Sequence, residues 1–124
     1  MKIGHGIDIV SVRRIRRSIV RGGHAVLNRV YTTGEKAYCH PRARRFEHYA
    51  ARFAAKEAFM KALGDRVSRL AFNQIEVQKK PSGKPFITLS KALLKKAGLS
   101  PRAKIELSLS HDRDYAIASV IIIH

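Results

Sequence analysis

The sequence is poor in cysteine, in acidic residues and in long apolar runs. Its one cysteine, Cys39, excludes a disulfide within the chain, so we expect a reducing compartment, the cytoplasm. No run approaches the roughly 18 apolar residues of a membrane span. Gly4, Gly6 and Asp8 interrupt the apolar residues near the N-terminus. We therefore expect neither a membrane span nor a signal peptide.

The chain also lacks internal repeats, low-complexity tracts and a recognisable linker. Its 124 residues are fewer than the roughly 150 typical of one domain, so we expect residues 1–124 to form a single domain. Hydrophobic residues make up 45% and charged residues 27%, a balance typical of a chain that buries a core. A chain of this size needs neither a metal nor a disulfide for stability, and its apolar residues are numerous enough to allow a subunit interface as well.

Positive charge dominates the chain. Twenty-five lysines and arginines face nine acidic residues, which gives a net charge of +16 and predicts an acidic partner. Nucleic acid, anionic lipid, a phosphorylated cofactor and an acidic protein all satisfy this condition. A small basic nucleic-acid-binding module is therefore an alternative function, although the chain has no tryptophan and no zinc-finger spacing.

Periodicity predicts the secondary structure of the N-terminal half. Residues 2–10 alternate as a strand, with Ile3, Ile7 and Ile9 on one face and Asp8 on the other. A basic helix follows Ser11 and ends at Gly22 and Gly23. Two further helices are expected, one from residue 33 to before residue 41 and a long one over residues 42–63 that ends at Gly64.

The C-terminal half alternates like strands. Residues 72–77 and 85–89 are predicted strands around the turn at residues 81–83, and residues 90–97 a short helix. Two strands are expected within residues 103–123, separated by the segment 111–114. The second is apolar on both faces, which is typical of a strand in the middle of a sheet. These patterns predict an α+β domain with a mostly antiparallel sheet and a long central helix.

The apolar stripe of the predicted long helix contains a glutamate. Spacings of four and three place on one stripe Phe46, Ala50, Phe53, Glu57, Met60 and Gly64. An ionised carboxylate in apolar surroundings needs a cation or a metal, and Lys61 is the nearest candidate in sequence. The simple interpretation is an ordinary Glu57 and Lys61 helix pair.

A second carboxylate, Asp8, lies beside two glycines, Gly4 and Gly6, near the end of the first strand. Its simple interpretation is a cap for the following helix. Magnesium, however, is typically held by one or two carboxylates together with substrate phosphates and water. Two of only nine acidic residues in semi-apolar elements therefore indicate a metal and phosphate site built on Asp8 and Glu57.

Four blocks of sequence resemble one enzyme family. They are GIDIV at 6–10 followed by Arg14 and Ile15, RFAAKEAFMKALG at 52–64, SGKP at 82–85 and SLSHDRDYAIASV at 108–120. In this order and approximate spacing the chain resembles the holo-acyl-carrier-protein synthases, small 4'-phosphopantetheinyl transferases. The resemblance spans essentially the whole chain. The larger transferases of this kind contain two copies of the fold, and 124 residues hold one.

The resemblance implies an activity. It is the magnesium-dependent transfer of 4'-phosphopantetheine from coenzyme A to a serine of apo acyl carrier protein, with release of adenosine 3',5'-bisphosphate, in the service of fatty acid biosynthesis. It also implies a homotrimer with active sites between neighbouring protomers. We therefore expect no nucleic-acid partner and no membrane span.

The resemblance also assigns residues. Asp8 and Glu57 match the magnesium ligands, and Lys61 is expected to steady the phosphates or the leaving group. Expected contacts to coenzyme A come from Arg52, Lys84 and His111. Arg42, Arg44 and Arg45 are expected to contact its 3'-phosphate, with a general anion-attracting patch as the alternative. For Arg52 and Lys84 a solvated surface position is the alternative. Lys56 matches the family pattern too, with a structural role as its alternative.

The arginines of the first helix are expected to bind the carrier. Arg14, Arg17 and Arg21 recur at spacings of three and four, so they form a cationic stripe suited to an acidic helix. Such a stripe speeds encounter and fixes orientation. The chain departs from the family pattern after Gly64, because residues 65–69 replace the usual loop rich in glycine and threonine.

Overall fold

The computed structural model describes residues 1–66 and 69–124, so Val67 and Ser68 of the unusual loop lie outside the described residues. Within that part the elements follow in the order β1 (Ile3–Ser11), α1 (Val12–Val30), α2 (Thr33–Cys39), α3 (Arg45–Leu63), β2 (Glu76–Lys79), β3 (Pro85–Thr88), α4 (Lys91–Lys96), β4 (Lys104–His111) and β5 (Tyr115–Ile123). Short 3₁₀ turns cover Gly64–Arg66 and Phe72–Gln74. No helix in the described ranges is both long and apolar enough for a bilayer.

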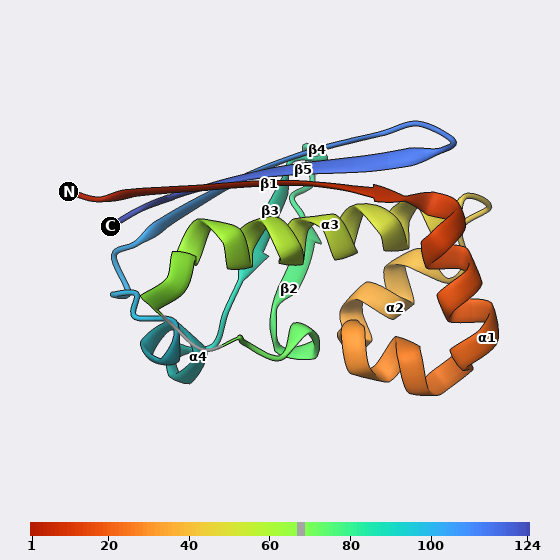
Figure 1. Ribbon diagram of the computed structural model, residues 1–124, viewed down its shortest axis with the longest axis horizontal. Helices are drawn as coiled ribbons and strands as arrows, with labels where there is room; N and C mark the ends of the chain where they lie inside the picture. Colours follow the sequence, from red (N-terminus) through yellow and green to blue (C-terminus); the bar gives the residue numbers. More distant parts are fainter. Residues whose placement is uncertain (67–68) are drawn as a thin grey trace.

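An antiparallel sheet with the order β1-β5-β4 lies along α3, and β2 and β3 form a separate hairpin (Figure 1). The central position of β5 confirms the prediction from its two apolar faces. Its inner face, with Ala118, Val120 and Ile122, is buried against α3. The α+β class, the mostly antiparallel sheet and the long central helix are thereby confirmed.

The buried face of α3 consists mainly of alanines. Fully or almost fully buried are Ala51, Ala54, Ala55, Ala58, Phe59 and Ala62. The predicted stripe through Glu57 is the half-buried flank of this face, with Phe53 and Met60 packed at the margin of the core. Small side chains dominate because the backbone of β1 comes very close to the helix.

Two glycines make this close approach possible. A Cβ atom on Gly6 would lie 1.9 Å from the carbonyl oxygen of Ala58, and one on Gly4 would lie 2.2 Å from that of Ala62. These contacts are with backbone, which cannot move aside as a side chain can. Glycine is therefore required at both positions for β1 to carry Asp8 onto α3.

We expect the Gly6→Ala variant to lose about 3 kcal/mol of unfolding free energy, because β1 has to move away from α3. The measurement is urea denaturation followed by circular dichroism. Gly83→Ala is the control, since nothing lies within 4 Å of its Cβ position and only its φ of 91° resists the change. Its expected cost is about 1 kcal/mol. Equal midpoints for Gly6→Ala and the wild type would contradict the packing.

The helices at one end of the sheet differ partly from prediction. Gly23, with φ 56° and ψ −138°, breaks the helix where the sequence predicted its end, but a second helical segment that was not predicted follows and continues to Val30. The predicted helix α2 is confirmed, with a capping box between Thr32 and Glu35. Helix α3 begins at Arg45 rather than at residue 42, because residues 40–44 form turns.

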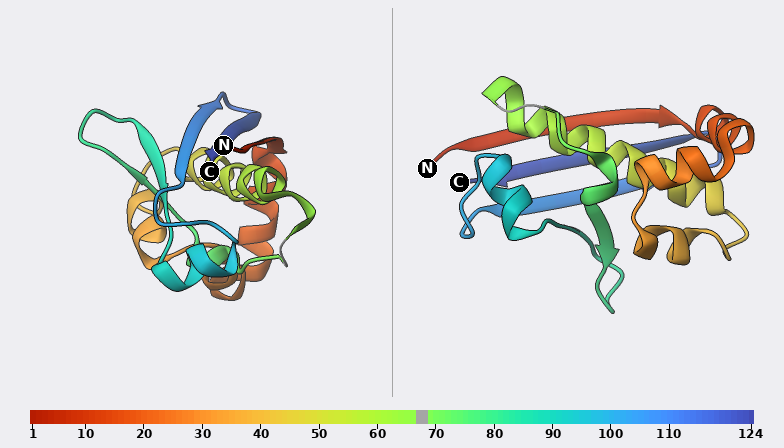
Figure 2. Two further views of the ribbon diagram at one scale, coloured as in Figure 1. Left: turned by 90° about the vertical axis from the view of Figure 1, so that its left-hand side faces the viewer. Right: turned by 90° about the horizontal axis from the view of Figure 1, so that it is seen from below.

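The predicted strand 72–77 is wrong in its first half. Phe72–Gln74 forms a 3₁₀ turn, and the strand β2 begins at Glu76. The turn buries the Phe72 ring edge-on against Phe53 of α3. The predictions for β3, α4, β4 and β5 are confirmed. Figure 2 shows the β2–β3 hairpin projecting from the body of the protein.

The face of the sheet that points away from α3 is apolar and exposed. No described helix or strand covers it (Figure 1). Relative exposures of 38–68% are found for Ile3, Ile7, Ile9, Tyr115, Ile117 and Ile121. The register pairs Ile9 with Ile117, so these side chains form one surface, which we call the isoleucine face. Large exposed apolar surfaces of this kind mark interaction sites.

Candidate active site

Two predicted site residues, Asp8 and Lys61, meet beside β1, and Glu57 lines a surface pocket together with Lys61. Asp8 lies on the face of β1 that packs on α3, and its side chain is 16% exposed. Lys61 of α3 places its Nζ atom 3.0 Å from the Asp8 Oδ1 atom and donates a hydrogen bond to the carbonyl of Ile7. Glu57 lies one turn before Lys61 on the same helix. We call Asp8, Glu57 and Lys61 the carboxylate cluster.

The ion pairs differ from the simple sequence interpretations. Glu57 accepts a hydrogen bond from Arg69, with 2.7 Å between Oε1 and the terminal guanidinium nitrogen, so the expected Glu57 and Lys61 pair is wrong. Asp8 does not cap α1, because Ser11 does so by accepting from the backbone N–H of Arg14. Both carboxylates are therefore neutralised by cations from other elements.

The donor atoms of the carboxylate cluster suit a hard divalent cation. No group of three or more His, Cys, Asp or Glu side chains that could hold a metal occurs in residues 1–66 and 69–124. Two carboxylates are nevertheless the usual protein share of a magnesium site completed by phosphates and water. The cations now paired with them, Lys61 and Arg69, are 54% and 62% exposed and free to turn away. Asp8 and Glu57 therefore fit a magnesium ion.

A second cluster lies at the other edge of the sheet. Arg52, Lys79 and His111, which we call the cationic cluster, line a cavity of about 120 Å³. Arg52 is only 1% exposed, so its alternative as a solvated surface residue is wrong. Its guanidinium donates to the carbonyl of His48, while the buried Nε atom has no hydrogen-bond partner among the described residues. An orphaned buried donor suits an incoming acceptor.

His111 lies beside a carboxylate and a second histidine. Its Nδ1 atom lies 3.2 Å from Oε1 of Glu47, a carboxylate that also contacts Arg44 at 3.7 Å. Burial, helped by the charges of Arg52 and His111, lowers the pKa of His48 to about 4. His48 is therefore neutral at physiological pH and adds no charge to the cationic cluster.

Two other predicted contacts lie further out. Arg45 donates to the carbonyl of His40 and rests on the Phe46 ring. Lys84 pairs with Glu106 at 3.3 Å, with both side chains 55% exposed. An exposed pair of this kind contributes little and leaves the Lys84 ammonium available to a ligand.

Helix α3 separates the two clusters within one chain. Arg52 and Lys61 are nine residues apart, which places them about 180° apart around the helix axis. Lys61 turns to β1, whereas Arg52 shares its cavity with Leu109 and His111 of β4. Because β5 lies between β1 and β4, the two clusters are on opposite flanks of the same helix.

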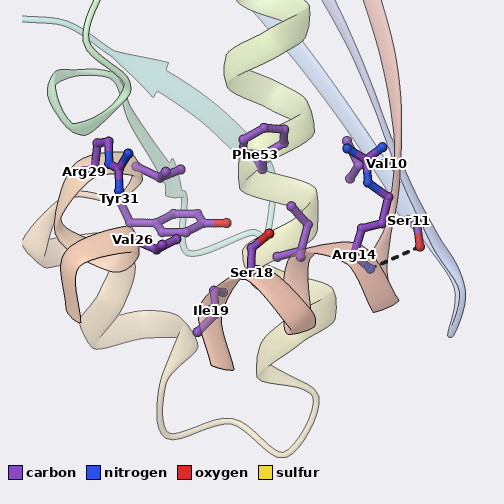
Figure 3. Close-up of a pocket in the computed structure, with 11 residues that line it drawn as sticks. Val10, Ser11, Arg14, Ser18, Ile19, Val26, Arg29, Tyr31 and Phe53 are labelled. Carbon is purple, nitrogen blue, oxygen red and sulfur yellow. Dashed lines mark hydrogen bonds between the residues drawn. The ribbon is translucent and has the colours of Figure 1, made fainter. Parts of the chain in front are cut away.

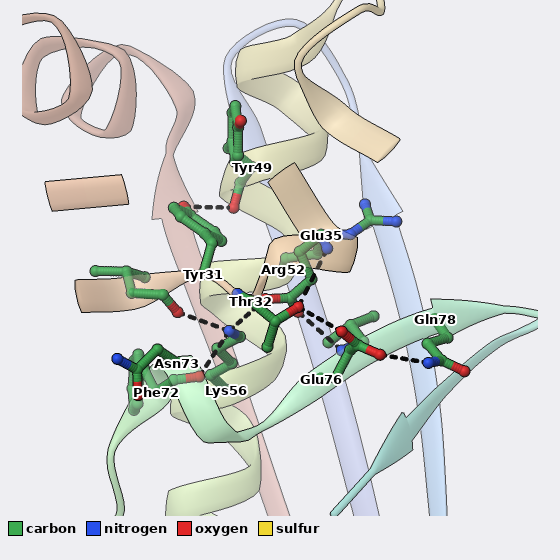
Figure 4. A network of polar contacts seen from close by, with 12 residues as sticks. Tyr31, Thr32, Glu35, Tyr49, Arg52, Lys56, Phe72, Asn73, Glu76 and Gln78 are labelled. Carbon is green, nitrogen blue, oxygen red and sulfur yellow. Dashed lines mark hydrogen bonds and ion pairs between the residues drawn. The ribbon is translucent and has the colours of Figure 1, made fainter. Parts of the chain in front are cut away.

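Lys56 is structural. Its ammonium is fully buried and contacts Glu35 at 2.6 Å and the carbonyls of Val30 and Phe72 (Figure 4). Burial lowers its pKa, against the raising effect of Glu35. Glu35 also accepts from the backbone N–H of Val77, so one ion pair joins α1, α2, α3 and β2. The structural alternative stated for Lys56 is correct.

The arginine stripe of α1 lies beside a pocket that the sequence did not reveal. Arg14, Arg17 and Arg21 are all exposed. A pocket of about 270 Å³ opens next to Arg14, between α1, the end of β1 and α3 (Figure 3). Val10 and Phe53 line it. Val10 follows Asp8 by two residues and Phe53 precedes Glu57 by one turn, so the pocket adjoins the carboxylate cluster.

Comparisons with known proteins agree on one family. The family described as "4'-phosphopantetheinyl transferase superfamily" matches residues 4–120. A holo-[acyl-carrier-protein] synthase of Koribacter versatilis is 45% identical over 124 residues, covering 98% of each chain. The crystal structure of the synthase from Neisseria meningitidis is 34% identical with a TM-score of 0.84, covering 98% of each chain. That from Helicobacter pylori, in complex with coenzyme A, is 34% identical with a TM-score of 0.81, covering 96% of this chain and 99% of the other.

These matches confirm the resemblance found in the four sequence blocks and set aside the nucleic-acid-binding module. The sequence match covers nearly the whole chain, and the fold carries the blocks onto the two clusters beside α3. The chain therefore belongs to the holo-[acyl-carrier-protein] synthases of the 4'-phosphopantetheinyl transferase superfamily.

Proposed function

We propose that this chain transfers 4'-phosphopantetheine from coenzyme A to a serine of apo acyl carrier protein, in the cytoplasm and in the service of fatty acid biosynthesis. The serine oxygen attacks the β-phosphorus of the pyrophosphate, and the bond to the bridging oxygen breaks. Adenosine 3',5'-bisphosphate leaves, and the serine proton passes to a base. The observation that carries the proposal is the pair of partly buried carboxylates, Asp8 and Glu57, beside one lysine.

Asp8 and Glu57 are the proposed magnesium ligands. The ion supplies positive charge that offsets the charge developing on the pyrophosphate during transfer. Lys61 approaches the same place from α3 and, once it leaves Asp8, its ammonium is free to bind a phosphate oxygen of the leaving group. Arg69 has to leave Glu57 in the same way. The carboxylates thus exchange one set of positive partners for another.

The cationic cluster is the proposed binding site for the other phosphate groups of coenzyme A. Arg52 offers its unpaired buried Nε atom, and His111 offers an imidazole hydrogen bond. Arg44, Arg45 and Lys84 lie further out and are proposed as outer contacts. A substrate with three phosphates requires this many cations, because each phosphate oxygen gains a charge-assisted partner.

We further propose a homotrimer in which the carboxylate cluster of one protomer faces the cationic cluster of the next. The flanks of α3 keep these clusters apart within one chain, so a neighbouring copy is needed for both to reach one coenzyme A. The isoleucine face supports this assembly, because its exposed side chains lose contact with water when copies pack on it.

The carrier protein is proposed to dock on α1. Arg14, Arg17 and Arg21 attract its acidic surface, and the pocket beside Arg14 has room for an apolar side chain. A carrier held there presents its serine close to Asp8, since the pocket and Asp8 share the inner face of β1.

The proposed function predicts a defined change in mass. Incubation with magnesium, coenzyme A and apo acyl carrier protein is expected to add one phosphopantetheine to each carrier, measured by intact-protein mass spectrometry. Omission of magnesium in the presence of EDTA, or replacement of the acceptor serine by alanine, is expected to abolish the change. An unmodified carrier, under conditions in which the Helicobacter pylori synthase modifies it, would overturn the proposal.

A further inference from the structure

We propose that Tyr38 is a positioning residue that gathers Arg42, Arg52 and Lys79 on its ring and so forms a binding site for a phosphomonoester group. The proposal rests on the proposed function, in which this group is the 3'-phosphate of coenzyme A. Tyr38 belongs to none of the four sequence blocks that carry the family resemblance. It lies on α2, whereas the three cations come from the loop before α3, from α3 itself and from β2.

The distances identify the ring as the common neighbour. The guanidinium carbon of Arg42 lies 3.4 Å from the centre of the Tyr38 ring, and that of Arg52 lies 4.3 Å away. The Lys79 ammonium lies 5.5 Å from the same centre. All three lie within the roughly 6 Å at which a cation is attracted by an aromatic ring. Arg42 also donates a hydrogen bond to the carbonyl oxygen of Tyr38.

Three positive charges around one ring repel one another, and carboxylates do not offset them. None of the ion pairs in residues 1–66 and 69–124 involves Arg42, Arg52 or Lys79. The nearby carboxylate of Glu76 accepts hydrogen bonds from Thr32 and Gln78 instead. The Tyr38 ring therefore attracts the two guanidinium groups, its hydroxyl holds Lys79 by a hydrogen bond, and an anion completes the arrangement.

Cavities adjoin the ring and show where an anion fits. Tyr38 lines a cavity of about 280 Å³ together with Arg52, Glu76 and Lys79. Arg52 and Lys79 also line the neighbouring cavity of about 120 Å³ that contains His111. Arg52 thus stands between the two cavities with an unpaired buried Nε atom. A phosphomonoester is the fitting ligand, because it brings close to two negative charges and three strong acceptor oxygens.

The ring is held rigidly enough to serve as a platform. A buried ion pair between Glu35 and Lys56 anchors helix α2 on α3 (Figure 4). Glu35 lies one turn before Tyr38 on α2, and Lys56 lies one turn after Arg52 on α3. The His48 ring packs edge-on against Tyr38, with 5.5 Å between ring centres. A fixed ring restricts the long arginine and lysine side chains before the ligand arrives, which lowers the entropy lost on binding.

The test compares two small probes, adenosine 3',5'-bisphosphate and adenosine 5'-monophosphate, by isothermal titration calorimetry with the assembled enzyme at fixed ionic strength. We expect Tyr38→Leu to weaken binding of the bisphosphate about tenfold and to change binding of the monophosphate less than about twofold, because only the bisphosphate carries the 3'-phosphate. Tyr38→Phe keeps the aromatic face and loses only the hydrogen bond of the hydroxyl to Lys79, so we expect it to weaken binding of the bisphosphate less than about threefold.

A second variant, Arg42→Gln, removes one cation without changing the core, and it is expected to show a smaller loss for the bisphosphate alone. Equal losses for both probes would overturn the proposal, since they indicate general damage to the fold. Wild-type binding by Tyr38→Leu would overturn it too, as would equal weakness of Tyr38→Phe and Tyr38→Leu. If the wild-type enzyme binds neither probe, the proposed function fails first, so the two failures are distinguishable.

Discussion

Replacing Glu57 by glutamine is expected to lower the rate of phosphopantetheine transfer by about a hundredfold or more. The change keeps the shape of the side chain but removes the negative charge that is proposed to hold magnesium. Loss of a metal that stabilises developing charge is worth several kcal/mol, and each 1.4 kcal/mol corresponds to a tenfold change in rate. The measurement is the initial rate of carrier modification at saturating coenzyme A.

Glu106→Gln is the matched control. Glu106 is also paired with a cation, Lys84, but it is 55% exposed on the outer face of β4 and away from the carboxylate cluster. It pairs in register with Ile121 of the isoleucine face, so sedimentation velocity first has to show that the variant assembles as the wild type does. We expect this variant to retain the wild-type rate. Mn²⁺ binding, followed by electron paramagnetic resonance, separates metal loss from other effects. A Glu57→Gln enzyme that binds Mn²⁺ and turns over within threefold of wild type would refute the ligand assignment.

A charge introduced on the isoleucine face is expected both to separate the subunits and to abolish activity. Ile9 is 59% exposed in the single chain, so Ile9→Asp leaves the folding of one protomer nearly unchanged. In the proposed trimer, the new carboxylate is buried against a neighbour without a partner, which is costly. By sedimentation velocity, the wild type is expected to show three times the 13.9 kDa mass of one chain, and the variant the mass of a single chain.

Val20→Asp is the control for this change. Val20 is 68% exposed, but it lies on α1 and not on the sheet. We expect Val20→Asp to sediment as the wild type does, because a charge at that place meets water. If Ile9→Asp also sediments as the wild type, the isoleucine face is not the subunit interface and another surface has to serve.

The sequence predicted the elements that have a clear period and missed what depends on contacts between elements. β5 was placed in the centre of the sheet because it is apolar on both faces. The continuation of α1 beyond Gly23 was missed, since a glycine pair usually ends a helix. The 3₁₀ turn at Phe72 was missed because its burial against Phe53 depends on tertiary packing.

The candidate site was predictable where motif and physical reasoning coincided. Asp8 and Glu57 were found as unusual carboxylates, and the family blocks gave them a role. The predicted partner of Glu57 was wrong, because Arg69, twelve residues further on, belongs to the loop that departs from the family pattern. Tyr38 and Lys79 carry no motif. Only the meeting of α2, α3 and β2 makes them neighbours of Arg52.

The position of α3 between the two clusters was not visible in the sequence. Arg52 and Glu57 stand five residues apart in one block, and such proximity suggests one site. Helical geometry instead turns them about 140° away from each other. The block therefore encodes two halves that face different neighbours, and this is why the trimer is central to the proposed mechanism.

Subunit mixing tests this arrangement most directly. Glu57→Gln and Arg52→Gln enzymes, each nearly inactive alone, are unfolded together in equal amounts and refolded, and carrier modification is measured. If each site combines the carboxylate cluster of one protomer with the cationic cluster of the next, about a quarter of the sites in random trimers regain both intact halves, and activity returns to about that fraction of wild type. A mixture no more active than the separate variants would contradict the shared site.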